Sequence, residues 1–225
     1  MKILSIDTAS NLCTVAVLED KKCVKEIIVD DARNHSEKIM PVIEQVLNET
    51  NLSLKDINLI VCDKGPGSFT GIRIGVGTVL AFKDSLDIKC IGISSLEALA
   101  YNVETNNIVC TLIDAKNNNV YFGLFKSENN CYKQIGNLNF HTIDDAISLL
   151  KQYSNQITFV GDGALTYKDY IQKQIPNCLF SSKNNLSSIS LGIAGFNNYN
   201  NDNYDNLIPL YLRKSQAERA LDGDK

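Results

Sequence analysis

One glycine-rich stretch decides the fold of this chain: Gly65-Pro66-Gly67-Ser68-Phe69-Thr70-Gly71. It follows a continuous apolar run at residues 57–62, which is typical of a strand buried on both faces of a sheet. A helix is predicted to follow over residues 70–86. At such a junction the backbone amides point outward and the helix dipole favours an anion. The stretch therefore indicates an α/β fold of the nucleotide-binding type.

The role of the glycines does not follow from the fold, because the stretch matches neither of the common phosphate-binding motifs. Residues 72–73 are Ile-Arg where a P-loop needs Lys and Ser or Thr, and Thr70 stands where GxGxxG needs its third glycine. Gly67, Gly71 and Gly75 recur every four residues and would form one smooth helical face. Two alternatives stay open: close packing or a partner interface, which we favour, and phosphate binding with Gly67 as a contact.

Outside this stretch one pattern occurs twice. Residues 2–18 and residues 109–125 each read as a strand ending in Ile-Asp, a polar turn and a second strand. A third strand candidate follows each copy, near residues 24–29 and 132–140, and then helix, strand and helix signals follow. We therefore predict two duplicated βββαβα lobes, the second one reduced.

The boundary between the lobes is predicted at the Asn-rich break near residue 106. The first lobe would comprise residues 1–104, and the second residues 105–225 with a C-terminal docking tail. Within that tail, residues 197–206 read as an unpacked loop, residues 207–213 as an apolar segment that docks, and Ser215 as the cap of a short final helix.

Asp7 and Asp114 occupy equivalent places at the ends of the two first strands. Carboxylates there could hold a magnesium–phosphate group between the lobes. Each could instead cap its own turn. The turns at residues 8–12 and 115–119 contain no glycine that would let the backbone approach a phosphate, which favours capping.

Composition excludes several other classes of protein. The 22 basic and 26 acidic side chains give a net charge of −4, which disfavours broad attachment to nucleic acid or anionic lipid. No apolar run reaches membrane-spanning length, so we expect a cytoplasmic protein without a membrane partner.

The two histidines, His35 and His141, form no metal-binding pair, and no nucleophile and base are brought together by the sequence. We expect no catalytic or metal-binding residue.

Motifs across nearly the whole chain resemble those of the bacterial TsaB family, also called YeaZ. The motifs are Ile6-Asp7-Thr8, His35-Ser36-Glu37, residues 65–75 (GPGSFTGIRIG), residues 92–100 (GISSLEALA) and Pro209-Leu210-Tyr211-Leu212-Arg213. The resemblance implies an actin-like, Hsp70-like ATPase fold (the ASKHA, ribonuclease H-like class), which agrees with the internal duplication.

The resemblance also implies a function. Members of this family act as non-catalytic subunits that bind and support TsaD, which forms N6-threonylcarbamoyladenosine at position 37 of tRNAs reading codons that begin with A. TsaE joins the assembly, ATP and metal are expected on TsaD, and tRNA is reached only through the complex. The first two helices of the first lobe form the contact with TsaD or with a second copy in a homodimer. In this chain that contact would use Ile39, Ile43, Gly71, Ile74 and Gly75.

An alternative function is a small ATP-dependent kinase or hydrolase of the same fold, which would use Asp7 and the cleft between the lobes. A glycoprotease is disfavoured, because the sequence offers neither a nucleophile nor a set of zinc ligands.

Overall fold

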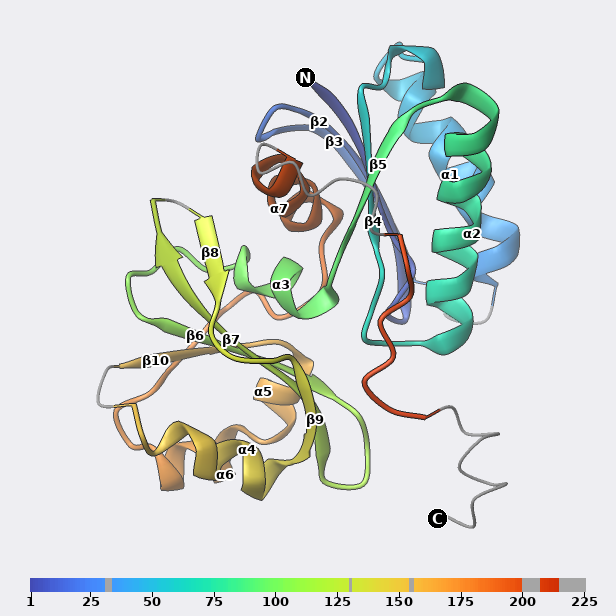
Figure 1. Ribbon diagram of the computed structural model, residues 1–225. Coiled ribbons are helices and arrows are strands. Elements are labelled where there is room, and N and C mark those ends of the chain that lie inside the picture. The colour runs from blue at the N-terminus through green and yellow to red at the C-terminus, as the bar shows by residue number, and fades with distance from the viewer. Residues whose placement is uncertain (31–33, 130, 154–155, 200–206, 215–225) are drawn as a thin grey trace.

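The computed structural model describes residues 1–30, 34–129, 131–153, 156–199 and 207–214. It contains two sheets, each covered by helices, which form two lobes (Figure 1). No helix within these residue ranges has the length and apolar character needed to cross a bilayer.

The first lobe has a five-stranded sheet in the order β3-β2-β1-β4-β5. Its strands are β1 (Lys2–Asp7), β2 (Leu12–Glu19), β3 (Lys22–Asp30), β4 (Leu59–Asp63) and β5 (Lys89–Ile93). The first three form an antiparallel meander, and β4 and β5 continue parallel to β1. The helical segments of this part are α1 (His35–Glu49), the 3-10 turn η1 (Leu54–Asp56), α2 (Phe69–Leu86) and α3 (Ser95–Ala100).

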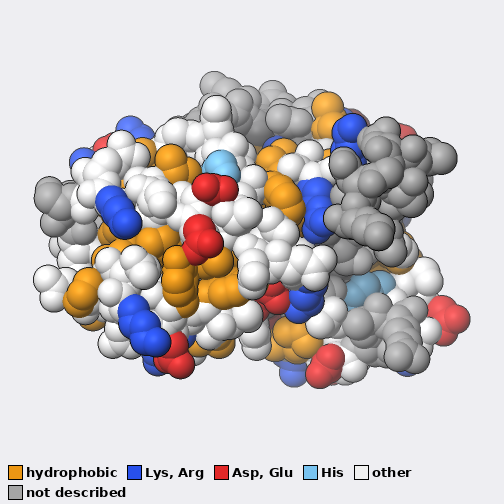
Figure 2. Space-filling view, turned by 90° about the horizontal axis from the view of Figure 1, so that it is seen from below, with side chains coloured by type: hydrophobic (Ala, Val, Ile, Leu, Met, Phe, Trp, Pro, Cys, Tyr) orange, Lys and Arg blue, Asp and Glu red, His pale blue; other side chains and the backbone are white. Residues whose placement is uncertain are grey.

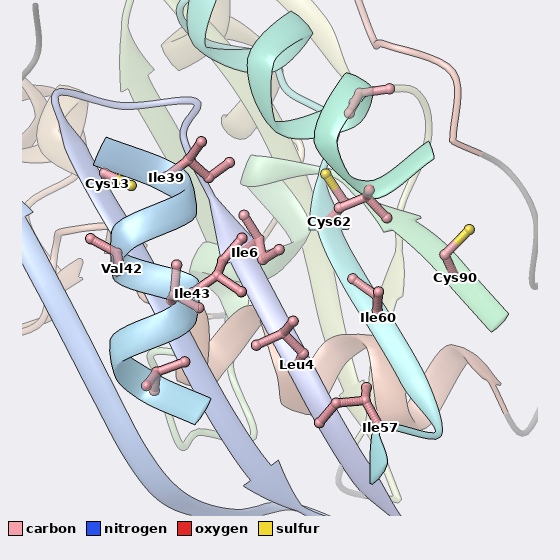
Figure 3. Close-up of a cluster of buried hydrophobic side chains, with 14 of the residues drawn as sticks. Leu4, Ile6, Cys13, Ile39, Val42, Ile43, Ile57, Ile60, Cys62 and Cys90 are labelled. Carbon is pink, nitrogen blue, oxygen red and sulfur yellow. The ribbon is translucent and has the colours of Figure 1, made fainter. Parts of the chain in front are cut away.

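The central strands are apolar on both faces because helices cover both sides of the sheet. Helices α1 and α2 cover one face and α7 (Ser188–Tyr199) covers the other (Figure 1). Figure 3 shows Ile39 and Ile43 of α1 pointing toward Leu4 and Ile6 of β1. The apolar stripe of α1 thus faces its own sheet.

The second lobe repeats this plan. Its sheet has the order β11-β10-β6-β7-β8, and β9 also pairs with β7. The strands are β6 (Ile108–Asp114), β7 (Asn119–Glu128), β8 (Cys131–Gln134), β9 (Asn139–Thr142), β10 (Ile157–Val160) and β11 (Leu179–Phe180), and the helices are α4 (Ile143–Leu150), α5 (Asp162–Thr166) and α6 (Lys168–Gln174). The predicted duplication is confirmed, and the two-residue β11 makes the second lobe the reduced one.

Two details of the second half differ from expectation. The single strand predicted near residues 132–140 is two short strands, β8 and β9, because the chain turns between them at Gly136, where φ is +68°. The loop predicted from residue 197 begins later, since α7 continues to Tyr199 and Asn197 is buried. Residues 200–206 lie outside the described residues, as does the predicted helix after Ser215.

Helix α7 also changes the assignment of residues to lobes. It packs on β1, β2, β4 and β5 of the first sheet, although the sequence placed all of residues 105–225 in the second lobe. Two glycines permit this approach: a Cβ at Gly192 would lie 2.6 Å from Leu18 Cδ1, and one at Gly195 would lie 2.3 Å from Val61 Cγ2. The chain therefore returns to the first lobe after completing the second sheet.

Candidate functional site

The glycine-rich stretch lies against the turn that follows β1. A Cβ built at Gly67 would lie 2.2 Å from the carbonyl oxygen of Ala9, and one at Gly71 would lie 1.9 Å from that of Thr8. Real Cβ atoms do not approach an oxygen so closely, so both positions require glycine. The glycines serve close packing of the start of α2 on the chain's own first turn, which is the alternative that the sequence favoured.

Three amides of the stretch bond to oxygens of the chain itself. The amide of Gly65 donates to Asp63 Oδ1 at 2.7 Å, and the amide of Ser68 donates to the Ala9 carbonyl at 2.7 Å. The Gly71 amide donates to Ser68 Oγ at 3.2 Å. A phosphate site would direct these amides toward its ligand. Here the chain's own oxygens occupy three of them.

Beneath this stretch Asp7 and Asp63 form a buried carboxyl pair, each 1% exposed. Asp7 Oδ1 accepts from the Ala9 amide at 2.7 Å. Asp63 Oδ1 accepts from the Gly65 amide and from Ser95 Oγ, both at 2.7 Å. Neither Oδ2 atom has a hydrogen-bond partner among the described residues, and the two carboxyl groups lie close enough for the charge of one to act on the other.

Burial and mutual repulsion favour the protonated form of this pair. Burial raises the pKa of Asp7 well above its usual range, and repulsion from the Asp63 carboxylate raises it further. Burial raises the pKa of Asp63 to about 6, although the bond from Ser95 opposes the rise. A proton kept by Asp7 would allow it to donate to Asp63 and so to link the ends of β1 and β4. The sequence interpretation missed Asp63, although an acid that ends a buried strand just before the glycines was a usable signal.

A cavity of about 380 Å³ lies between the lobes, and both Gly67 and Asp114 line it. Asp7 is not among its lining residues. Asp114 Oδ1 accepts from the Lys116 amide at 2.9 Å, and its Oδ2 lies 2.6 Å from Lys116 Nζ. Asp7 and Asp114 thus each accept from the amide two residues on, which confirms the turn-capping alternative for both.

The histidines lie apart from this cavity's lining. His35 is buried and its Nε2 lies 3.0 Å from the Ser10 carbonyl, so it joins the start of α1 to the first turn. His141 lies on β9 in the other lobe. Among the residues that the structure describes, no three His, Cys, Asp or Glu side chains are placed to hold a metal ion.

The side chains predicted to contact a partner face largely inward. Ile39 is 2% exposed in the core, while Gly71 and Gly75 pack against Thr8. Ile74 is half-buried against the same core. Ile39, Gly71 and Gly75 are therefore buried within the chain itself, because the apolar stripe of an amphipathic helix packs against its own sheet.

A different face of the same helices is open. A groove of about 970 Å³ runs along α1, η1 and the end of α2, and Ile43 lies in its lining. Met40 is 49% exposed and Leu86 38% exposed beside it, with Glu44 and Lys55 among the lining residues. Large apolar side chains that are exposed to solvent beside charged side chains are typical of a protein-binding groove.

The surface charge is mixed on the face that Figure 2 shows. Lys and Arg side chains alternate there with Asp and Glu, and apolar side chains lie in small groups between them. This face therefore carries no broad basic field of the kind that binds nucleic acid non-specifically.

Comparison with known proteins gives the family. A family model described as "TsaD: tRNA N6-adenosine threonylcarbamoyltransferase" matches residues 26–221. The "tRNA threonylcarbamoyladenosine biosynthesis protein TsaB" of Bacillus subtilis (strain 168) is 31% identical over 222 residues, which cover 97% of this chain and 96% of that protein. The protein of the same description from Haemophilus influenzae is 26% identical over 234 residues, covering 99% and 98%.

Solved structures show the same fold. YeaZ from Pseudomonas aeruginosa superposes with a TM-score of 0.80 at 22% identity, over 94% of this chain and 99% of that chain. A ROK hexokinase from Thermus thermophilus superposes with a TM-score of 0.55 at 9% identity, over 89% and 100%. This chain belongs to the TsaB (YeaZ) family, and its duplicated lobes have the actin-like, Hsp70-like ATPase fold.

Proposed function

We propose that the chain is a non-catalytic subunit that binds a TsaD-type enzyme and supports the formation of N6-threonylcarbamoyladenosine at position 37 of tRNA. The observation that carries this proposal is the glycine-rich stretch, three of whose amides bond to the chain's own oxygens and so are not directed toward a phosphate. ATP and metal would then act on the partner, and this chain would contribute a binding surface.

The residue content of the chain supports this division of roles. Its two histidines lie on α1 and β9 and provide no His-x-x-x-His pair. The relatives' names place them in tRNA threonylcarbamoyladenosine biosynthesis, and the matching family model carries the name of the transferase. A chain that matches the transferase's family model and has no histidine pair to hold a metal fits a supporting subunit.

The open groove along α1, η1 and α2 is the contact surface in this proposal. Its apolar lining matches the buried centre of a protein interface, and Glu44 and Lys55 match the polar rim. The same surface could pair two copies of this chain, so a homodimer and the TsaD complex would exclude each other. We further propose that TsaE joins the complex in the cytoplasm and that tRNA is bound only in the complete assembly.

Co-elution with the cognate TsaD tests the proposal. The wild-type chain is expected to elute with TsaD as one species in size-exclusion chromatography. Met40→Glu places a charge in the proposed contact and is expected to weaken the complex about tenfold or more. Leu179→Glu is the matched control, because Leu179 is 46% exposed in the second lobe against 49% for Met40. Separate elution of the two wild-type proteins would contradict the proposal.

A further inference from the structure

The C-terminal segment, residues 207–214, builds a second groove away from the one along α1. It runs beside α2 (Figure 1) and is fixed there by the Leu210 amide, which donates to the Lys64 carbonyl at 2.7 Å. Leu207 is buried in the first lobe's core. The groove, of about 380 Å³, is lined by Phe69 and Arg73 of α2 and by residues 211–214. Side chains almost 140 positions apart in the sequence thus meet.

The lining side chains are held in place. The rings of Phe69 and Tyr211 stack with centroids 4.7 Å apart and planes 8° apart. Arg73 Nε donates to the Tyr211 hydroxyl at 2.9 Å. Arg213 Nη1 donates to the Ala115 carbonyl at 3.2 Å, and its guanidinium lies 4.9 Å from the centroid of the Phe140 ring. Both guanidinium groups are therefore positioned by the fold before any ligand arrives.

The groove differs in charge from the rest of the chain. Arg73, Arg213 and Lys214 line it, and none of its described lining residues is acidic, although the whole chain has a net charge of −4. Arg73 and Lys214 are exposed. Each bond given above uses one of the five N–H donors of a guanidinium, which leaves the fork geometry that binds phosphate oxygens in pairs.

We propose that this groove docks the phosphate backbone of RNA, and that the RNA is the tRNA on which the assembly acts. The identity of the RNA rests on the proposed function. Three cations beside an anchored aromatic pair suit a phosphodiester backbone, whose charges are regularly spaced and bound by Arg and Lys. The chain would contribute a local contact within the assembly, because its net negative charge opposes strong binding of RNA by this chain alone.

Salt-dependent binding of an unmodified tRNA transcript tests the proposal. Fluorescence anisotropy would compare assemblies of TsaD and TsaE that contain either the full-length wild-type chain or a double variant, Arg73→Gln and Lys214→Gln, at several salt concentrations. Two lost phosphate contacts are expected to weaken binding about tenfold and to lower the slope of log affinity against log salt by about 1 to 2. Lys151→Gln with Lys173→Gln is the matched control, because it removes two exposed charges, one just after α4 and one in α6, and should change neither quantity beyond a small uniform loss.

Each outcome has one interpretation. Equal losses in the double variant and its control would overturn the proposal, and so would wild-type binding that salt does not weaken or that is absent. If the double variant no longer co-elutes with TsaD, the groove binds an acidic protein surface and the RNA proposal is wrong. The co-elution of the wild-type chain with TsaD reports on the proposed function separately.

Discussion

At the scale of single residues, the contact between the glycine-rich stretch and the first turn leaves no room for a side chain at Gly67 or Gly71. Gly71 is buried against the Thr8 carbonyl, and Thr8 Oγ1 donates to the Gly71 carbonyl at 2.7 Å. The two segments are therefore joined by packing and by a hydrogen bond, and neither can move without the other.

Gly71→Ala tests this contact. The added methyl would lie 1.9 Å from the Thr8 carbonyl oxygen, so the start of α2 must shift, and the expected loss in the free energy of unfolding is about 1–3 kcal/mol. Gly77→Ala is the matched control on the same helix, because no atom lies within 4 Å of its added Cβ. There the alanine should stabilise the helix by up to about 1 kcal/mol. Urea unfolding of both variants measures the difference, and equal effects would contradict the packing role.

The Asp7–Asp63 pair predicts a pH dependence of stability. Both carboxyls keep protons to higher pH in the folded chain than in the unfolded chain, where the ordinary pKa is 3.8. Their contribution is therefore fully present below pH 3.8 and is lost as the pH rises through the folded values, about 6 for Asp63 and a raised one for Asp7. The slope is roughly 1.4 kcal/mol per pH unit for each retained proton.

Asp7→Asn should flatten this profile, because the amide can donate to Asp63 without a titrating proton. The variant is expected to be more stable than the wild-type chain at pH 8 and to differ less at pH 5. Urea unfolding across this range measures it, with the exposed Asp84→Asn as control. Parallel curves for wild type and Asp7→Asn would show that the pair does not retain a proton.

The sequence predicted part of this site. It placed Asp7 and Asp114 at equivalent strand ends and favoured turn capping, because both turns lack glycine. It did not reveal that Asp63 pairs with Asp7, since that contact depends on the pairing of β1 with β4. Helical periodicity places Ile39 on the apolar face of its helix. It cannot show whether that face contacts the chain's own sheet or a partner protein.

At the scale of elements, the C-terminal segment joins the two lobes. Leu210 and Tyr211 contact Lys64, Phe69 and Arg73 of the first lobe. Arg213, two residues on, bonds to the second lobe at Ala115. The segment therefore spans both lobes beside their cleft.

A double-mutant cycle measures the strength of this connection. Phe69→Ala and Tyr211→Ala should show a coupling of about 0.5–1.5 kcal/mol in the free energy of unfolding, because the stacked rings contact each other directly. Tyr170→Ala on α6 is the control, since Tyr170 is 37% exposed and has no ring contact with Phe69 among the contacts described. Its coupling with Phe69 should be close to zero. Equal coupling in both cycles would mean that the stack adds nothing.

The sequence predicts the order of helices and strands wherever the signal comes from neighbouring residues. The two Ile-Asp copies, the apolar run before the glycines and the helix over residues 70–86 follow from periodicity, and the structure confirms them. The packing of α7 on the first sheet could not be read in this way. It depends on Gly192 and Gly195 meeting Leu18 and Val61, which are far away in the sequence.

At the scale of the whole molecule, the duplicated fold keeps the cavity between its lobes, while three amides of the glycine-rich stretch are bonded to the chain's own oxygens. We therefore expect no measurable heat when Mg-ATP at millimolar concentration is titrated into the isolated chain. The cognate TsaD, titrated in the same way, is the positive control. Saturable heat from the isolated chain would instead support the alternative of a small ATP-dependent enzyme.

The most direct test of the supporting role is the yield of N6-threonylcarbamoyladenosine in a reconstituted reaction. Purified TsaD, TsaE, tRNA, ATP and the activated threonylcarbamoyl donor would be combined with the wild-type chain, with Met40→Glu, with Leu179→Glu or with no addition. The proposed function predicts full yield with the wild-type chain and Leu179→Glu, a strong loss with Met40→Glu, and little product without the chain. Full yield without the chain, or product from the chain in the absence of TsaD, would contradict it.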